Sequence, residues 1–152
     1  MSDDVMDALA GISGSALAAL RRQRPDVVNH LQGSDDAIFA PQADGGFSRA
    51  ERAAAALRIA TVLRDGALEA HYRRRLAALG ETSPLGGERG VAVLRHVDCV
   101  TTSPGDASRA DIDSLLAAGL SRHAVVSLSQ LIAFVNFQSR VLAGLRMLKG
   151  AA

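Results

Sequence analysis

Polar side chains within a long apolar segment near the C-terminus are the first candidates for chemistry. Ser129, Asn136 and Arg140 are separated by seven and four residues, which places them on one face of a helix. An arginine beside an asparagine in an apolar wall suits a carboxylate or enolate ligand. The alternative, which we favour, is a buried polar seam between helices or subunits that backbone carbonyls satisfy. Gln130 and Gln138 carry the same two interpretations, and an interface is favoured over a ligand.

Two further side chains could take part in proton transfer or nucleophilic attack. His71, next to Tyr72, could act as a general base, although an exposed helix histidine is the commoner finding. Cys99 lies close in sequence to His96 and Asp98, as an activated thiol could. Lone cysteines in cytosolic chains are nevertheless more often inert filler, so catalysis by Cys99 is the less favoured interpretation.

The remaining charged and metal-binding residue types give no pattern of their own. The four histidines are scattered, and no two of them have the helical spacing of paired metal ligands, so we expect no metal and no cofactor. The run from Arg73 to Arg75 is most simply a solvated helix face near a helix C-terminus, where cations are favoured.

Composition indicates one helical domain. The chain has 152 residues, enough for a single core. Apolar residues make up 48% and aromatic residues only 3%, so small and aliphatic side chains must fill the interior between helices. Lys plus Arg (17) nearly balances Asp plus Glu (16), which predicts neither nucleic acid nor a membrane surface as partner. The acidic start and the single cysteine favour a cytoplasmic location.

Helix boundaries in the middle of the chain are marked by capping residues. Ser48 and Glu51 form a capping box that predicts a helix to about Leu63. After a break at Asp-Gly, a second helix is expected over 67–79, and Gly80 can end it in a left-handed conformation.

The C-terminal part is marked in the same way. Ser108 and Asp111 form a second capping box that opens a short helix ending at Gly119. Ser121 then caps a long helix over 122–149. Because this helix is apolar nearly all round and is interrupted by polar residues, we expect it in the centre of a bundle or across a subunit contact, not across a membrane.

Elsewhere the sequence is less decisive. We expect two short helices between Asp3 and Arg24, stopped by Pro25, and then irregular chain over 29–46 that can hold one helical turn. The segment 90–98 could be a strand or a short helix, and a helix is favoured in an otherwise helical chain. The predicted organisation is therefore one all-α domain, 1–152, made of an N-terminal part (1–46), a helical pair (47–80) and a short helix followed by a long core helix (108–149).

The helical pair and the long helix could be an internal repeat. A shift of 73 residues lays Ser48 on Ser121 and Ile59 on Ile132, so that the cap and the start of each helix fall in register. A structural duplication and two independently capped amphipathic helices are both consistent with this match.

Two segments resemble a known superfamily. The segment Gly119–Asn136 resembles the helix of alkylhydroperoxidase D-like proteins, in which a Leu-Ser cap opens a helix that runs through an Asn to a Cys-x-x-Cys pair. The segment Phe47–Leu79 looks like the preceding helical pair of the same family. The longer frame from Val5 to Leu145 is similar to an uncharacterised branch of carboxymuconolactone decarboxylase-domain proteins. The resemblance implies a multi-helix bundle that assembles as a dimer, trimer or hexamer.

The resemblance also implies that the redox chemistry of that superfamily is lost. Its motif of a Glu, two cysteines and a His falls on Val126, Gln138, Val141 and Leu145. Glu and His relay protons there, one thiolate attacks peroxide and the second cysteine resolves the sulfenic acid. None of the four residues at these positions can perform those steps, so thiol peroxidase activity of this type is not expected.

Three functions stay open after this comparison. The first is a non-redox member that binds a small molecule or serves as partner subunit to a catalytically complete homologue. The second is an enzyme of the decarboxylase or isomerase kind in which Arg140 and Asn136 hold an acid and His71 carries a proton. The third, and least favoured, is peroxide reduction through Cys99 alone.

Overall fold

The computed structural model describes residues 4–40, 46–81 and 83–151, and the secondary structure in these ranges is helical with no strand, as the sequence predicts. The helices are α1 (Val5–Ala10), α2 (Ala16–Arg21), α3 (Pro25–Ile38), α4 (Arg49–Val62), α5 (Gly66–Ala78), α6 (Gly87–Thr102), a 3-10 turn η2 (Pro104–Asp106), α7 (Arg109–Ala117) and α8 (Arg122–Gly150).

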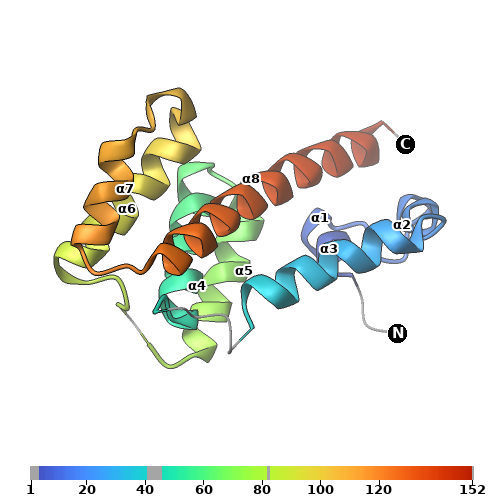
Figure 1. Cartoon of the computed structure of the whole chain (residues 1–152). Helices are drawn as coiled ribbons and strands as arrows, with labels where there is room; N and C mark the ends of the chain where they lie inside the picture. The colour runs from blue at the N-terminus through green and yellow to red at the C-terminus, as the bar shows by residue number, and fades with distance from the viewer. Residues whose placement is uncertain (1–3, 41–45, 82, 152) are drawn as a thin grey trace.

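Helix α8 is the axis of the molecule. One half of it packs against the hairpins α4–α5 and α6–α7, and the other half extends away with α1 to α3 beside it (Figure 1). The described ends of the chain lie toward the same end of the molecule (Figure 1). Of the residues in α8, Leu128, Leu131, Val135 and Leu142 are fully buried, which agrees with the expected central position.

The predicted capping residues are confirmed. The Ser48 hydroxyl accepts a hydrogen bond from the Glu51 backbone N–H at 3.2 Å, and the Glu51 carboxylate accepts one from the Ser48 N–H at 2.7 Å. Ser108 donates its N–H to Asp111 at 2.8 Å, and the Ser121 hydroxyl caps α8 through the Ala124 N–H at 3.0 Å. These contacts satisfy donors that a helix start leaves unpaired.

Small side chains let α4 approach its neighbours closely. Ala53, Ala55, Ala56 and Ala60 are completely buried, so α4 contacts α5, α6 and α8 at once. Arg52 is also buried, and its guanidinium donates to the backbone carbonyls of Ile38 and Ala40 at 2.6 and 3.2 Å. The charged group therefore replaces solvent at the C-terminal end of α3.

The expectation of irregular chain over 29–46 is wrong for its first part. Pro25 does end the preceding segment, but it does so as the first residue of α3, which continues to Ile38. A proline is well placed there because its missing N–H would have no helical partner and its fixed φ suits a helix. Residues 41–45 lie outside the described residues. The segment 90–98, by contrast, is helical as favoured, within the longer α6.

The two segments related by the 73-residue shift agree at their start and differ in their second part. Helix α4 ends where Arg64 adopts a left-handed φ of 56° and Asp65 caps α5 through the Leu68 N–H at 3.2 Å. At the positions shifted by 73 residues, Phe137 and Gln138, α8 continues without a break. The first segment is thus a helical pair and the second is a single long helix.

Arg89, in the first turns of α6, joins three separate segments. Its guanidinium donates to the Glu51 carboxylate at 2.6 Å, to the Gly119 carbonyl at 3.0 Å and to the Gly46 carbonyl. These contacts tie the start of α6 to the start of α4 and to the turn between α7 and α8.

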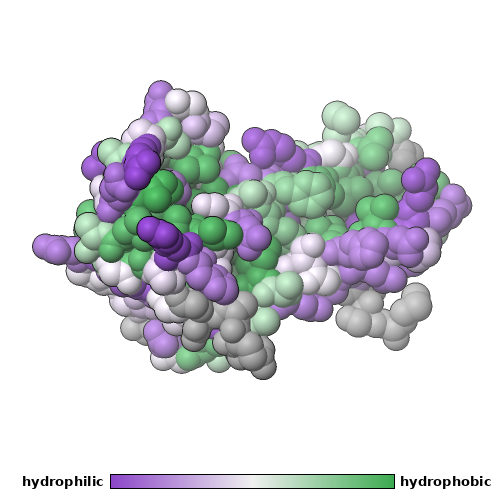
Figure 2. Space-filling model, in the orientation of Figure 1, coloured by the Kyte–Doolittle hydropathy of each residue, from purple (hydrophilic) through white to green (hydrophobic). Residues whose placement is uncertain are grey.

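Helix α8 is also the one helix among the described residues whose length and composition would allow it to cross a membrane, with half of its most apolar window buried inside the fold. The core helix of a soluble protein passes the same test, so this feature is compatible with a soluble chain. Hydrophobic side chains form a band along α8, with hydrophilic side chains over α3 beside it (Figure 2).

Candidate functional site

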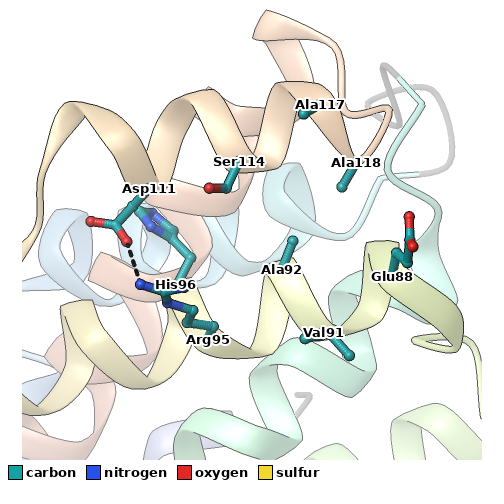
Figure 3. A pocket seen from close by; sticks show the side chains of 9 residues that line it. All are labelled: Glu88, Val91, Ala92, Arg95, His96, Asp111, Ser114, Ala117 and Ala118. Carbon is teal, nitrogen blue, oxygen red and sulfur yellow. Dashed lines mark ion pairs between the residues drawn. The ribbon is translucent and has the colours of Figure 1, made fainter.

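A pocket of about 450 Å³ lies between α6 and α7. Four apolar and five polar or charged side chains line it (Figure 3); the residues are Glu88, Val91, Ala92, Arg95 and His96 from α6 and Asp111, Ser114, Ala117 and Ala118 from α7. The two helices are held as a hairpin by the turn η2 and by the capping box at Ser108. The volume is in the range of small-molecule sites.

His96 is the residue that distinguishes this pocket from a simple gap between helices. Its side chain lies between α6 and α7 close to Asp111 (Figure 3). The residue is only 5% exposed, and its Nδ1 atom is buried without a hydrogen-bond partner. Buried polar atoms are normally paired. Because this nitrogen is not accessible to solvent, a ligand in the pocket would pair it by turning the His96 ring toward the cavity.

Burial decides the charge of His96. Desolvation lowers the pKa of the imidazole below its usual value, and the nearby Asp111 carboxylate opposes this shift only in part. The imidazole is therefore neutral at neutral pH, with one nitrogen able to donate a hydrogen bond and the other able to accept one.

Asp111 and Arg95 balance each other at the mouth of the pocket. Hydrogen bonds from the Ser108 backbone N–H and hydroxyl, both 2.8 Å long, lower the pKa of Asp111. The Arg95 guanidinium lies 3.9 Å from the other carboxylate oxygen and is largely exposed (Figure 3). The Asp111 charge is thus fixed in place, whereas Arg95 is free to move toward a ligand.

Ser114 adds a hydroxyl on the opposite wall. It donates to the Ala110 carbonyl at 2.8 Å, which leaves its oxygen lone pairs open to accept a hydrogen bond. The pocket can therefore hold a compact molecule with an apolar body and a polar head. Among the described residues, no group of three or more His, Cys, Asp or Glu side chains is placed to hold a metal ion.

The polar residues predicted on α8 do not form one group. Asn136 is buried, and its amide donates to the Ile132 carbonyl one turn earlier at 3.0 Å. Ser129 likewise donates to the Val125 carbonyl at 2.9 Å. Arg140 is exposed. The hydrogen bond from Asn136 to a backbone carbonyl is consistent with the interpretation of a buried polar seam. The carboxylate-binding role of Arg140 stays a prediction.

The four positions on which the resemblance places the superfamily's redox motif have separate surroundings. Val126 is 56% exposed, Val141 is half-buried and Leu145 is buried. Gln138, where the resemblance would place the first cysteine, is buried, and its amide oxygen accepts a hydrogen bond from the Tyr72 hydroxyl. This bond joins α5 to α8 within one chain; the sequence favoured an interface role for Gln138 but did not predict Tyr72 as its partner.

His71 and Cys99 lie on different helices, α5 and α6. The Nε2 atom of His71 is buried without a hydrogen-bond partner, and its ring meets the Tyr72 ring edge-on at 5.0 Å. Burial, and then the charge of Arg75, lower the pKa of His71. Cys99 is half-buried, with its thiol 3.9 Å from the Ser103 carbonyl. In the described part of the chain, no hydrogen bond joins His71, Cys99, Asn136 and Arg140 to one another.

Sequence reasoning missed the pocket because its residues come from two segments. His96 was one of four scattered histidines, and Asp111 was recognised only as a capping residue. The signal that could have found them is the hairpin itself, since a helix over 90–98 and a capped helix from Ser108, joined by a short loop, must pack side by side.

Comparison with known proteins adds no family to this description. The chain matches no protein-family model and no curated protein. Its resemblance to alkylhydroperoxidase D-like proteins therefore stays a prediction from the residues quoted above.

Proposed function

We propose that this protein binds a small molecule in the pocket between α6 and α7 and has no thiol peroxidase activity. The observation that carries the proposal is His96, which is 5% exposed, lines the pocket and has a buried Nδ1 without a partner. An unpaired buried nitrogen costs about 1–3 kcal/mol. A ligand that pairs it recovers part of that free energy, which a chance gap between helices would not offer.

The charges in the pocket favour an uncharged polar head group. His96 is neutral, and the carboxylate of Asp111 is offset by Arg95. A carboxylate ligand would meet Asp111 and Glu88, and an ammonium ligand would meet Arg95. A hydroxyl, amide or lactone carbonyl avoids both conflicts. The apolar walls formed by Val91, Ala92, Ala117 and Ala118 then receive the rest of the molecule.

The proposal agrees with the first of the three functions expected from the resemblance. Gln138 occupies the place of a family cysteine and is engaged by Tyr72, which supports a non-redox member of an alkylhydroperoxidase D-like bundle. A role as partner subunit to a catalytically complete homologue would depend on assembly and not on the α6–α7 pocket. The proposal also includes a cytoplasmic location.

An enzyme of the decarboxylase or isomerase kind is the second candidate, and one observation favours it. A neutral imidazole whose pKa is lowered by burial can accept a proton from a bound substrate at neutral pH. In that case the proton carrier is His96, not His71. Turnover of a γ-lactone or a β-keto acid that is lost in His96→Gln would support this candidate over simple binding.

The test uses the full chain labelled with ¹⁵N in its histidine rings. Phenol, benzamide and γ-butyrolactone are titrated separately, and the ring nitrogens of His96 are followed by NMR. We expect at least one probe to shift the His96 signals at millimolar concentration and to lose affinity in His96→Gln. The matched control is His30→Gln, an exposed histidine on α3. Probes that leave the His96 signals unmoved, or that bind equally well to His96→Gln, would contradict the proposal.

A further inference from the structure

One face of α8 has a regular pattern of exposure that the fold of a single chain does not use. Starting at position 126, steps of four and three residues reach side chains that are exposed or, at the last position, half-exposed; we call these six residues the α8 seam: Val126, Gln130, Ala133, Phe137, Arg140 and Gly144. Alternating steps of four and three are the spacing by which one helix packs along another. The large apolar members are open to solvent, with Phe137 at 50% and Val126 at 56%.

Grooves continue the seam on both sides. A groove of about 630 Å³ lies between α8 and α3, with Phe137 and Ala133 on one wall and Val27 and Leu31 on the other. A second groove, of about 520 Å³, lies between α8 and α7 next to Val126. The hydrophobic band of Figure 2 follows this course. A helix laid along the seam would therefore meet apolar walls beyond the seam itself.

The seam is complementary to itself when it is reversed. In an antiparallel pair centred between positions 133 and 137, Phe137 faces Ala133 of the second copy, and Val126 faces Gly144. Each layer then combines a large and a small side chain, as close packing requires. The remaining layer sets Gln130 against Arg140 of the second copy, and an amide oxygen can accept a hydrogen bond from the guanidinium.

Other arrangements lack this match. A parallel pair in register would oppose Arg140 to Arg140 and leave Ala133 facing Ala133 across a gap. In the antiparallel pair the two Arg140 residues are separated by ten residues of helix, or about 15 Å. The acyl chains of a membrane would also cover this face poorly. Gln130 and Arg140 lie within it, and a charged side chain in contact with lipid is costly.

We propose that two copies of this chain associate through the α8 seam as an antiparallel, twofold-symmetric dimer. The same patch on both copies forms such an interface, as closed twofold symmetry requires. The dimer does not depend on a ligand in the α6–α7 pocket, so either proposal can fail without the other.

Sedimentation equilibrium of the full chain gives the first test. We expect a particle of twice the 15.8 kDa chain mass. Phe137→Ala should weaken the dimer at least about tenfold, because buried aromatic side chains at the centre of an interface dominate its affinity. The control is Val91→Ala, an apolar residue on α6 that is 69% exposed and lies outside the seam; this variant should keep the parent affinity.

The antiparallel register is tested by exchanging the large and small side chains at positions 133 and 137. Ala133→Phe should also weaken the dimer, because two large side chains then compete for one layer. Combining Ala133→Phe with Phe137→Ala restores one large and one small side chain in that layer and should restore the dimer. Gln130→Glu should tighten the dimer in a salt-sensitive manner by pairing with Arg140 of the second copy, whereas Gln23→Glu, a change at an exposed glutamine between α2 and α3, should not.

Three results would overturn the proposal. The first is a mass of one chain at every concentration. The second is a dimer that Phe137→Ala leaves unchanged. The third is a combination of two results: the folded double variant Ala133→Phe with Phe137→Ala does not regain the dimer, and Gln130→Glu does not tighten the dimer. Together these results exclude the antiparallel register.

Discussion

The bond between Tyr72 on α5 and Gln138 on α8 allows a test with an internal control. Both residues are buried, with Tyr72 completely inaccessible and Gln138 2% exposed. Tyr72→Phe leaves the Gln138 amide without its donor, and Gln138→Leu leaves a buried hydroxyl without its acceptor. Each unpaired group costs about 1–3 kcal/mol. For a chain of this size, 1 kcal/mol corresponds to about 2–4 °C in the unfolding temperature.

The double variant should behave differently from the sum of its parts. When both partners are replaced by apolar side chains of similar shape, no polar group is left unpaired, so Tyr72→Phe with Gln138→Leu should be nearly neutral. Urea unfolding followed by circular dichroism measures all three variants, and Arg74→Ala, an exposed change on α5, should stay within about 0.5 kcal/mol of the parent. Two single variants as stable as the parent would refute the reasoning, because the bond would then contribute nothing to the junction of α5 and α8.

Three more predictions follow from individual contacts. Burial raises the pKa of Asp65, but hydrogen bonds from Arg146 and from the backbone outweigh it, so its folded pKa lies below the usual aspartate value of 3.8. The stability from this group is present above that pH and is lost as the pH falls through the folded pKa, so Asp65→Asn should reduce the loss measured by acid titration of circular dichroism. In Gly90→Ala the added Cβ would lie 2.3 Å from the Leu85 carbonyl oxygen. We therefore expect the free energy of unfolding, measured with urea, to fall by about 1–3 kcal/mol. An unchanged value would show that the loop containing Leu85 moves aside without cost. Peroxide consumption by the parent should not exceed the buffer rate, and Cys99→Ser should change nothing; turnover that this variant removes would restore the one-cysteine hypothesis.

The features that the sequence predicted are those determined by neighbours in the chain. The boxes at Ser48 and Ser108 and the cap at Ser121 involve residues at most three positions apart, and the structure confirms each of them. Such signals are local, so the chain need not be folded for them to be recognised.

Helix α3 was missed because distant residues stabilise it. Its own sequence contains Gly33 and few periodic apolar side chains. Its C-terminal turns are held by Asp35, which pairs with Arg75 of α5 at 2.8 Å, and by the carbonyl of Ile38, which accepts from Arg52. Tertiary contacts of this kind override a weak helix propensity. They cannot be predicted from the residues near α3 in the sequence.

The candidate site was missed for the same physical reason. Helical spacing predicts that Asn136 and Arg140 share a face, but spacing cannot say which helix covers each of them, and in the structure Asn136 is buried whereas Arg140 is exposed. His96 and Asp111 meet only because α6 and α7 fold back on each other, and the burial that leaves the His96 Nδ1 unpaired is a property of the packed hairpin.

The three-way bonding of Arg89 has a consequence for how the pocket can open. One guanidinium contacts Glu51, Gly119 and Gly46, so a displacement of α6 as a whole would break its hydrogen bonds to the start of α4 and to the turn between α7 and α8 together. The hairpin is therefore not a hinged cover over an otherwise rigid body. Solvent and solutes already reach the pocket without such a movement, because its lining side chains Val91, Arg95 and Ser114 are exposed.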